Sequence, residues 1–201
     1  MPVLGLDLDD TVMPYLEGLK TFIIQEEVDF FKGMTPEEIS SHFPDLATYN
    51  DFPWTLINGD RAKFEYYHEK AVDAGLLRNQ IAYPHASETL HRLVEEYDVQ
   101  VYIITSRFVV KGQHNKVLSD TGYALDANNI PYRDIMFVRR KVDVVADLYM
   151  DDAPHNLLSL QEAGRTTVTY NQSYNKTVPG ARVDNWETAQ PTILNLLNIT
   201  Q

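Results

Sequence analysis

Three carboxylates follow a short apolar run near the amino end of the chain. The sequence VLGL at residues 3–6 is typical of a buried strand in a parallel sheet, and it leads directly into Asp7, Asp9 and Asp10. In an open α/β sheet the ligand site lies beyond the carboxyl ends of the strands, and residues two apart tend to point the same way. Because neighbouring carboxylates repel each other, Asp7 and Asp9 indicate either a bound cation or a nucleophile paired with an acid/base.

Three more predicted strands end in residues that could take part in chemistry. Residues 99–104 precede Thr105, Ser106 and Arg107, residues 134–138 precede Arg139-Arg140-Lys141, and residues 146–150 precede Asp151-Asp152. Each group alone has an ordinary structural explanation, as a turn, a solvated surface or a helix cap. Parallel strands bring their carboxyl ends to one edge of a sheet, however, so we expect these groups to lie close to Asp7 and Asp9.

The combination of acids, hydroxyls and a lysine is suited to phosphoryl transfer. A phosphate monoester carries about two negative charges near neutral pH, and carboxylates such as Asp7 and Asp151 would bind Mg²⁺ beside it. One Asp carboxylate can attack phosphorus, and a second, Asp9, could protonate the leaving oxygen and then deprotonate the attacking water. Three side chains would donate hydrogen bonds to the phosphate oxygens: Thr105, Ser106 and Lys141.

The order of predicted elements gives an α/β fold, a Rossmann-like three-layer arrangement around a parallel sheet. After residue 84, helical patterns at 86–97, 113–122, 153–163 and 186–197 alternate with the strands named above and with one more at 166–170. Residues 13–84 instead hold helical patterns at 16–31, 35–43 and 61–74, with irregular segments between them. We therefore expect a core domain of residues 1–12 and 85–201, with a small helical cap of residues 13–84 inserted after the first strand.

Together these residues resemble the motifs of the haloacid dehalogenase-like (HAD) phosphohydrolases. DLDDTV at residues 7–12 is similar to the first motif, Thr105 to the second, Lys141 to the third, and Asp151-Asp152 to the acidic fourth. The resemblance implies that Asp7 is the nucleophile and that Asp9 is the acid/base, with its backbone carbonyl also on Mg²⁺. It further implies that Asp151 is the second carboxylate ligand of the metal, and that Thr105 and Lys141 bind phosphate.

Within that superfamily, residues 103–152 are most similar to the 5′(3′)-deoxyribonucleotidase group. Tyr15 occupies the place of an aromatic residue that packs on the base in this group. Two positions depart from the group, because Ala153 stands where it often has arginine and Arg107 where it often has proline. Arg107 is therefore a candidate to replace the missing cation. Further candidates for contact with the substrate are aromatic: Phe52, Trp54 and Phe108.

Composition limits the class of partner. The formal net charge of the 201 residues is −12, and no run of Lys and Arg interrupts it, so we expect no polynucleotide and no membrane partner. The chain has no cysteine, which excludes disulfides and thiolate catalysis. It shows no signal peptide and no apolar run near the ~20 residues of a membrane span. We expect a cytoplasmic protein whose partner is a small nucleotide, and a homodimer stays open.

These observations predict a Mg²⁺-dependent phosphatase of 5′- or 3′-nucleoside monophosphates, with a deoxyribonucleotide preference as one option, that works through an aspartyl-phosphate. The aromatic residues of the cap favour a flat base over another small phosphomonoester such as a sugar phosphate, which is the alternative within the same fold. A phosphatase of polynucleotide ends is disfavoured by the charge of −12. The alternative of another class is a non-catalytic module that binds a metal or phosphate, but it would need no acid at Asp9.

Overall fold

The computed structural model describes residues 1–49, 51–107 and 112–199. It contains an all-parallel, six-stranded sheet in the order β3-β2-β1-β4-β5-β6, which confirms the predicted α/β, Rossmann-like fold. The strands are β1 (Val3–Leu6), β2 (Gln100–Thr105), β3 (Asp134–Phe137), β4 (Leu148–Asp151), β5 (Thr167–Tyr170) and β6 (Ala181–Val183). β6 was not expected from the sequence, because three residues are too short to show a period of two.

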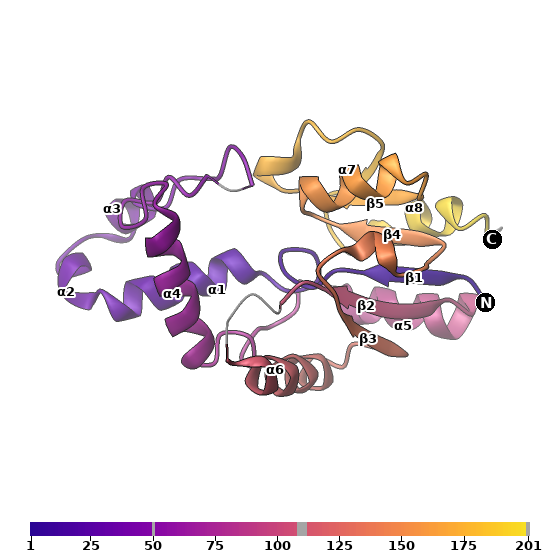
Figure 1. The fold of residues 1–201 in the computed structure, drawn as a ribbon, viewed down its shortest axis with the longest axis horizontal. Coiled ribbons are helices and arrows are strands. Elements are labelled where there is room, and N and C mark those ends of the chain that lie inside the picture. The colour runs from indigo at the N-terminus through magenta and orange to yellow at the C-terminus, as the bar shows by residue number, and fades with distance from the viewer. Residues whose placement is uncertain (50, 108–111, 200–201) are drawn as a thin grey trace.

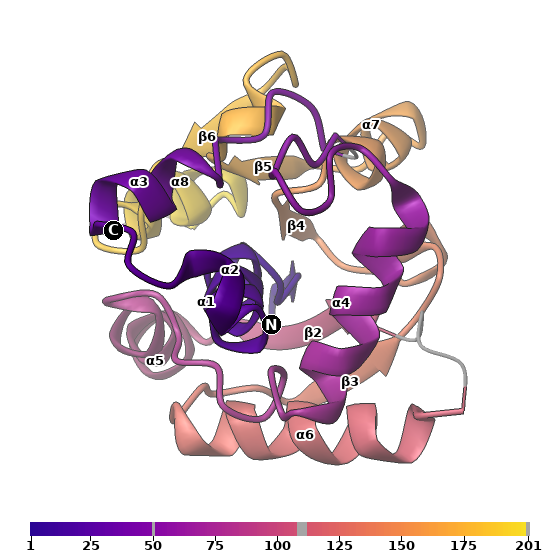
Figure 2. The ribbon, with the colours of Figure 1, turned by 90° about the vertical axis from the view of Figure 1, so that its left-hand side faces the viewer.

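Side chains that alternate along the strands form two separate apolar cores, one on each face of the sheet. On one face, Leu4 and Ile103 pack with residues of α5 (Ala86–Tyr97), α6 (His114–Ala127) and α8 (Ala189–Leu196). On the other face, Ile104 and Tyr149 pack with α7 (Pro154–Glu162). Figure 2 shows α5 and α8 on the side of the sheet opposite α7, so the core has three layers. α6 continues past Gly122, where its end was predicted.

Four helices stand apart from the sheet, beyond the carboxyl ends of its strands (Figure 1). They are α1 (Tyr15–Glu26), α2 (Val28–Phe31), α3 (Pro36–Ser41) and α4 (Arg61–Asp73). α3 begins at a capping box, in which the Thr35 hydroxyl accepts from Glu38 N–H and the Glu38 carboxylate accepts from Thr35 N–H. These helices bury their own apolar cluster, which includes Trp54 and Ile57.

The chain leaves the core for this helical unit and returns to the core at one place. The N–H of Tyr83 donates to the carbonyl of Val12 at 2.8 Å, so the outgoing and returning segments are joined directly. On this arrangement we propose that the cap consists of residues 13–84 and the core of residues 1–12 and 85–201. Among the described residues no helix has the length and apolar character that crossing a membrane requires.

Close packing around β1 leads to a prediction about Gly5. A Cβ added there would lie 2.6 Å from Ile104 Cδ1 and 3.2 Å from the Cβ of Ala146. We expect Gly5→Ala to lower the free energy of unfolding by about 1–3 kcal/mol, the usual range for overpacking, in urea titrations. Gly122→Ala is the matched control, because nothing lies within 4 Å of its added Cβ. It lies inside α6 and should stabilise by up to about 1 kcal/mol. Equal effects at both positions would contradict this account of the packing.

Candidate active site

A cavity of about 320 Å³ lies at the carboxyl ends of the strands, between the core and the cap. The predicted site residues that line it are Asp7, Asp9, Tyr15, Phe52, Thr105, Ser106, Arg107 and Lys141. Asp151 is buried directly behind this wall, against Lys141. Trp54 is not among the lining residues and is buried in the apolar cluster of the cap. Phe108 lies outside the described residues.

Lys141 is buried between two carboxylates. A short 3₁₀ helix at Lys141–Asp143 follows β3 and places the ammonium Nζ 2.6 Å from Asp7 Oδ1 and 2.6 Å from Asp151 Oδ2. Although burial lowers the pKa of Lys141, the charges of Asp151 and Asp7 raise it well above its usual value. Burial has the opposite effect on Asp7 and raises its pKa to about 7, although the positive charge of the nearby Lys141 acts to lower it.

A third acid completes a cluster that could hold a metal. Oxygens of Asp7, Asp151 and Asp152 lie within 4.8 Å of one another. Asp152 lines the cavity and accepts hydrogen bonds from Thr11 Oγ1 at 3.0 Å and from the hydroxyl of Tyr174 at 2.5 Å. Carboxylate oxygens are the donors that Mg²⁺ prefers, so the residues present fit this ion. Asp7, the backbone carbonyl of Asp9 and Asp151 were predicted as metal ligands, whereas Asp152 was not, although its position next to Asp151 was a signal.

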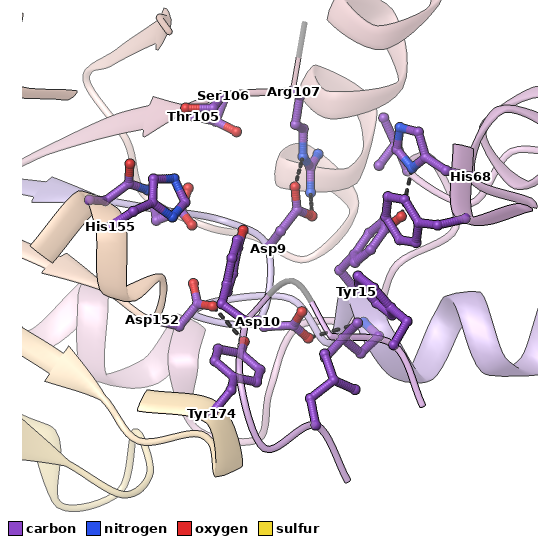
Figure 3. Close-up of a pocket in the computed structure, with 18 of the residues that line it drawn as sticks. Asp9, Asp10, Tyr15, His68, Thr105, Ser106, Arg107, Asp152, His155 and Tyr174 are labelled. Carbon is purple, nitrogen blue, oxygen red and sulfur yellow. Dashed lines mark hydrogen bonds and ion pairs between the residues drawn. The ribbon is translucent and has the colours of Figure 1, made fainter. Parts of the chain in front are cut away.

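Asp9 is held by a paired contact with Arg107. The guanidinium donates from Nε to Asp9 Oδ2 at 3.0 Å and from an Nη to Oδ1 at 2.7 Å (Figure 3). The same buried Arg107 donates to Thr121 Oγ1 at 3.0 Å and to Gln80 Oε1 at 2.7 Å. This geometry fixes the plane of the carboxylate. The arginine that was expected to face the substrate is therefore engaged with the predicted acid/base.

Two buried hydroxyls at the end of β2 lack a hydrogen-bond partner within the part of the chain that the structure describes. Thr105 Oγ1 and Ser106 Oγ are buried and make no hydrogen bond to any described residue. A buried hydroxyl without a partner is destabilising by about 1–3 kcal/mol. Both residues line the cavity beside Asp7 and Lys141. The four side chains can therefore act together on one anionic group.

The cap contributes an aromatic wall opposite these groups. The Tyr15 hydroxyl lies 2.6 Å from His68 Nδ1, as Figure 3 shows. Phe64 stacks on Phe52 and on His68, with ring centroids 4.3 and 5.9 Å apart respectively. Three further lining residues were not predicted from the sequence: Arg61, Phe64 and His68. Their spacing of three and four along α4 was a signal, because such residues share one face of a helix.

Comparisons with known proteins point to one kind of enzyme. A family model described as 5′ nucleotidase, deoxy (pyrimidine), cytosolic type C protein (NT5C) matches residues 1–198. A Chlorobaculum tepidum protein provisionally named a 5′(3′)-deoxyribonucleotidase is 28% identical over 186 residues, which cover 92% of this chain and 86% of that protein.

Solved structures share the fold at lower identity. A provisionally assigned phosphatase from Clostridium difficile has a TM-score of 0.61 and 16% identity, over 96% of this chain and 97% of that chain. A HAD-superfamily hydrolase from Geobacter sulfurreducens has a TM-score of 0.54 and 17% identity, over 96% of this chain and 98% of that chain. The chain therefore has the fold of the HAD hydrolases.

The raised pKa of Asp7 predicts how pH changes the stability of the metal-free protein. The carboxyl has a pKa of about 7 in the folded state and about 3.8 when unfolded, so the folded state retains a proton that the unfolded state releases between these values. The stabilisation is complete below the lower pKa and disappears as the pH rises through about 7. We expect the melting temperature in chelator to fall over this range by more in wild type than in Asp7→Asn, which cannot titrate.

Mg²⁺ should restore the stability that the metal-free protein loses as the pH rises, because a metal binds ionised carboxylates and stabilises only the folded state. Its effect on the melting temperature of wild type should be larger at pH 8 than at pH 5. An identical pH dependence of wild type and Asp7→Asn in chelator would show that Asp7 does not hold this proton.

Proposed function

We propose that this chain uses Mg²⁺ to hydrolyse nucleoside monophosphates through an aspartyl-phosphate at Asp7. The chain belongs to the NT5C family of 5′ nucleotidases and is therefore a phosphoric monoester hydrolase. The observation that carries the proposal is the pair of hydroxyls of Thr105 and Ser106, which bond to no described residue and line one cavity with Lys141 and Asp7. These donors match the oxygens of a phosphate, and the carboxylate is a nucleophile in reach of them.

In the first step a carboxylate oxygen of Asp7 attacks phosphorus, and the bond from phosphorus to the nucleoside oxygen breaks. Asp9 donates a proton to that oxygen, so the nucleoside leaves as an alcohol. Lys141 stabilises the charge that develops on the phosphoryl oxygens, together with the two hydroxyls. Since Arg107 occupies both oxygens of Asp9, we propose that substrate binding frees one of them for this transfer.

In the second step Asp9, now ionised, takes a proton from water. The water oxygen attacks phosphorus, the bond to Asp7 breaks, and inorganic phosphate leaves. Mg²⁺ would be held by carboxylate oxygens of Asp7 and Asp151 and by the backbone carbonyl of Asp9, with Asp152 adjacent to them. When bound, it supplies positive charge that offsets the charge of the phosphate.

The cap and the charge of the chain support a small nucleotide as substrate. Phe52, Phe64 and Tyr15 provide aromatic surface for a base, whereas the net charge of −12 disfavours a polynucleotide. The provisional name of the Chlorobaculum tepidum relative covers both 5′ and 3′ deoxyribonucleotides, and we propose the same pair of classes here. The chain has no cysteine and its family is described as cytosolic, so we propose that the protein acts in the cytoplasm.

The mechanism predicts that Asp7→Asn and Asp9→Asn impair different steps of the reaction. Asp7→Asn should lower kcat about 10⁴-fold or more for every nucleotide, because the nucleophile is lost. Asp9→Asn should also be slow, but with an aryl phosphate, whose leaving group needs no proton, it should accumulate phosphorylated protein. Phosphate release from 5′ and 3′ ribo- and deoxyribonucleotides, with Mg²⁺ or chelator, and intact mass measure these outcomes.

Asp147→Asn is the matched control, because this exposed acid lies at the opposite end of β4, where it accepts from the N–H of Val3. It should keep full activity. Full hydrolysis by Asp7→Asn would exclude the covalent mechanism, and wild-type preference for a sugar phosphate over every nucleotide would exclude the proposed substrate.

A further inference from the structure

His68 lines the cavity, and one of its two ring nitrogens is not used by the mechanism. It lies on α4, and its Nδ1 is 2.6 Å from the hydroxyl of Tyr15. Its other ring nitrogen, Nε2, is buried and has no hydrogen-bond partner among the described residues. His68 lines the same cavity as the catalytic acids, on the side formed by the cap (Figure 3).

The bond to Tyr15 indicates which nitrogen of His68 carries the hydrogen. Burial raises the pKa of Tyr15 and lowers that of His68, so the pair consists of a neutral phenol and a neutral imidazole. Among the described residues the Tyr15 hydroxyl has no other acceptor than Nδ1. If Nδ1 carried the hydrogen, the phenolic hydrogen would be left without a partner in a buried site. Tyr15 therefore donates to Nδ1, and Nε2 carries an N–H.

The surroundings of this N–H suit the edge of a flat, neutral ring. Phe64 stacks on the His68 ring at an interplanar angle of 9°, and Phe52 extends the aromatic surface. The phosphate donors Thr105, Ser106 and Lys141 instead lie on core elements of the opposite wall. A substrate that fills the cavity thus meets the phosphate donors at one end. At the other end it meets aromatic rings, the neutral His68 and the guanidinium of Arg61, which lies 5.5 Å from the centre of the Phe64 ring.

We infer that His68 is a specificity-determining residue that recognises the nucleobase, with its Nε2–H donating to a keto oxygen or ring nitrogen on the edge of the base. The inference rests on the proposed function, because it requires a nucleotide in the cavity. Tyr15 then has two tasks: its ring contributes aromatic surface, and its hydroxyl holds His68 in the tautomer that can donate.

Two amide substitutions separate the two nitrogens of the ring. In His68→Gln the amide reaches the position of Nε2 and can still donate to the base. In His68→Asn the shorter amide reaches only the position of Nδ1. We expect His68→Asn to lower kcat/KM for nucleoside monophosphates about tenfold, mainly through KM, as is usual for one lost hydrogen bond, and His68→Gln to stay close to wild type. Both variants should hydrolyse deoxyribose 5-phosphate, which has no base, at the wild-type rate.

Hydrolysis of deoxyribose 5-phosphate distinguishes failure of the proposed nucleotide substrate from failure of the inference about His68. If wild type hydrolyses deoxyribose 5-phosphate as well as it hydrolyses nucleotides, the proposed nucleotide substrate is wrong, and the inference about His68 is wrong with it. If wild type prefers nucleotides and His68→Asn keeps that preference unchanged, only the inference is overturned. Equal losses on both kinds of substrate would also overturn it, because they would assign His68 a purely structural role. Tyr15→Phe offers a second route that leaves position 68 intact, and it should reduce the preference for nucleotides in the same direction.

Discussion

One buried ammonium group allows several carboxylates to share the carboxyl edge of this sheet. Lys141 Nζ lies 2.6 Å from both Asp7 and Asp151, and all three side chains are almost inaccessible to solvent. Breaking a buried ion pair leaves an uncompensated charge, which is strongly unfavourable. A single lysine does not balance three acids, however, and Asp152 completes the cluster with a pKa that burial and Asp151 raise. Together the three acids form a cluster that could hold a cation, and a bound cation would offset the repulsion between them.

The residues that hold Asp152 and Asp9 in place also contact the cap. Tyr174, whose hydroxyl binds Asp152, also packs against Tyr49 of the cap with ring centroids 5.4 Å apart. On the other side, Arg107 holds Asp9 and is itself held by Gln80, which lies on the segment returning from the cap. A change in the position of the cap would therefore reach Asp152 and Asp9 through direct contacts. In the proposed mechanism these contacts would couple the position of the cap to the positions of Asp9 and Asp152.

Patterns along the chain predicted the sheet and the residues at its strand ends, because a parallel sheet gathers those ends whatever the loops do. Thr105 and Lys141 reached the cavity for this reason. The pairing of Arg107 with Asp9 could not be foreseen, since it depends on side chains 98 positions apart. Trp54 was expected to face the substrate but packs inside the cap, because an aromatic residue in an irregular segment has no period that shows which way it points. His68 had a helical period, but its proposed role depends on a buried nitrogen that has no hydrogen-bond partner among the described residues, which the sequence alone does not show.

The hydrogen bond between Val12 and Tyr83 holds the two ends of the proposed cap side by side. Two chain ends that already touch can be joined by a short turn, so the sheet needs no repair when everything between them is removed or replaced. The proposed nucleophile, Asp7, lies before this junction, and the proposed phosphate donors lie after it. Natural variation can therefore exchange one cap for another and change which molecule is enclosed, while the reaction itself is inherited intact. The same junction offers protein engineers a place to graft a foreign recognition module onto an unchanged catalytic base.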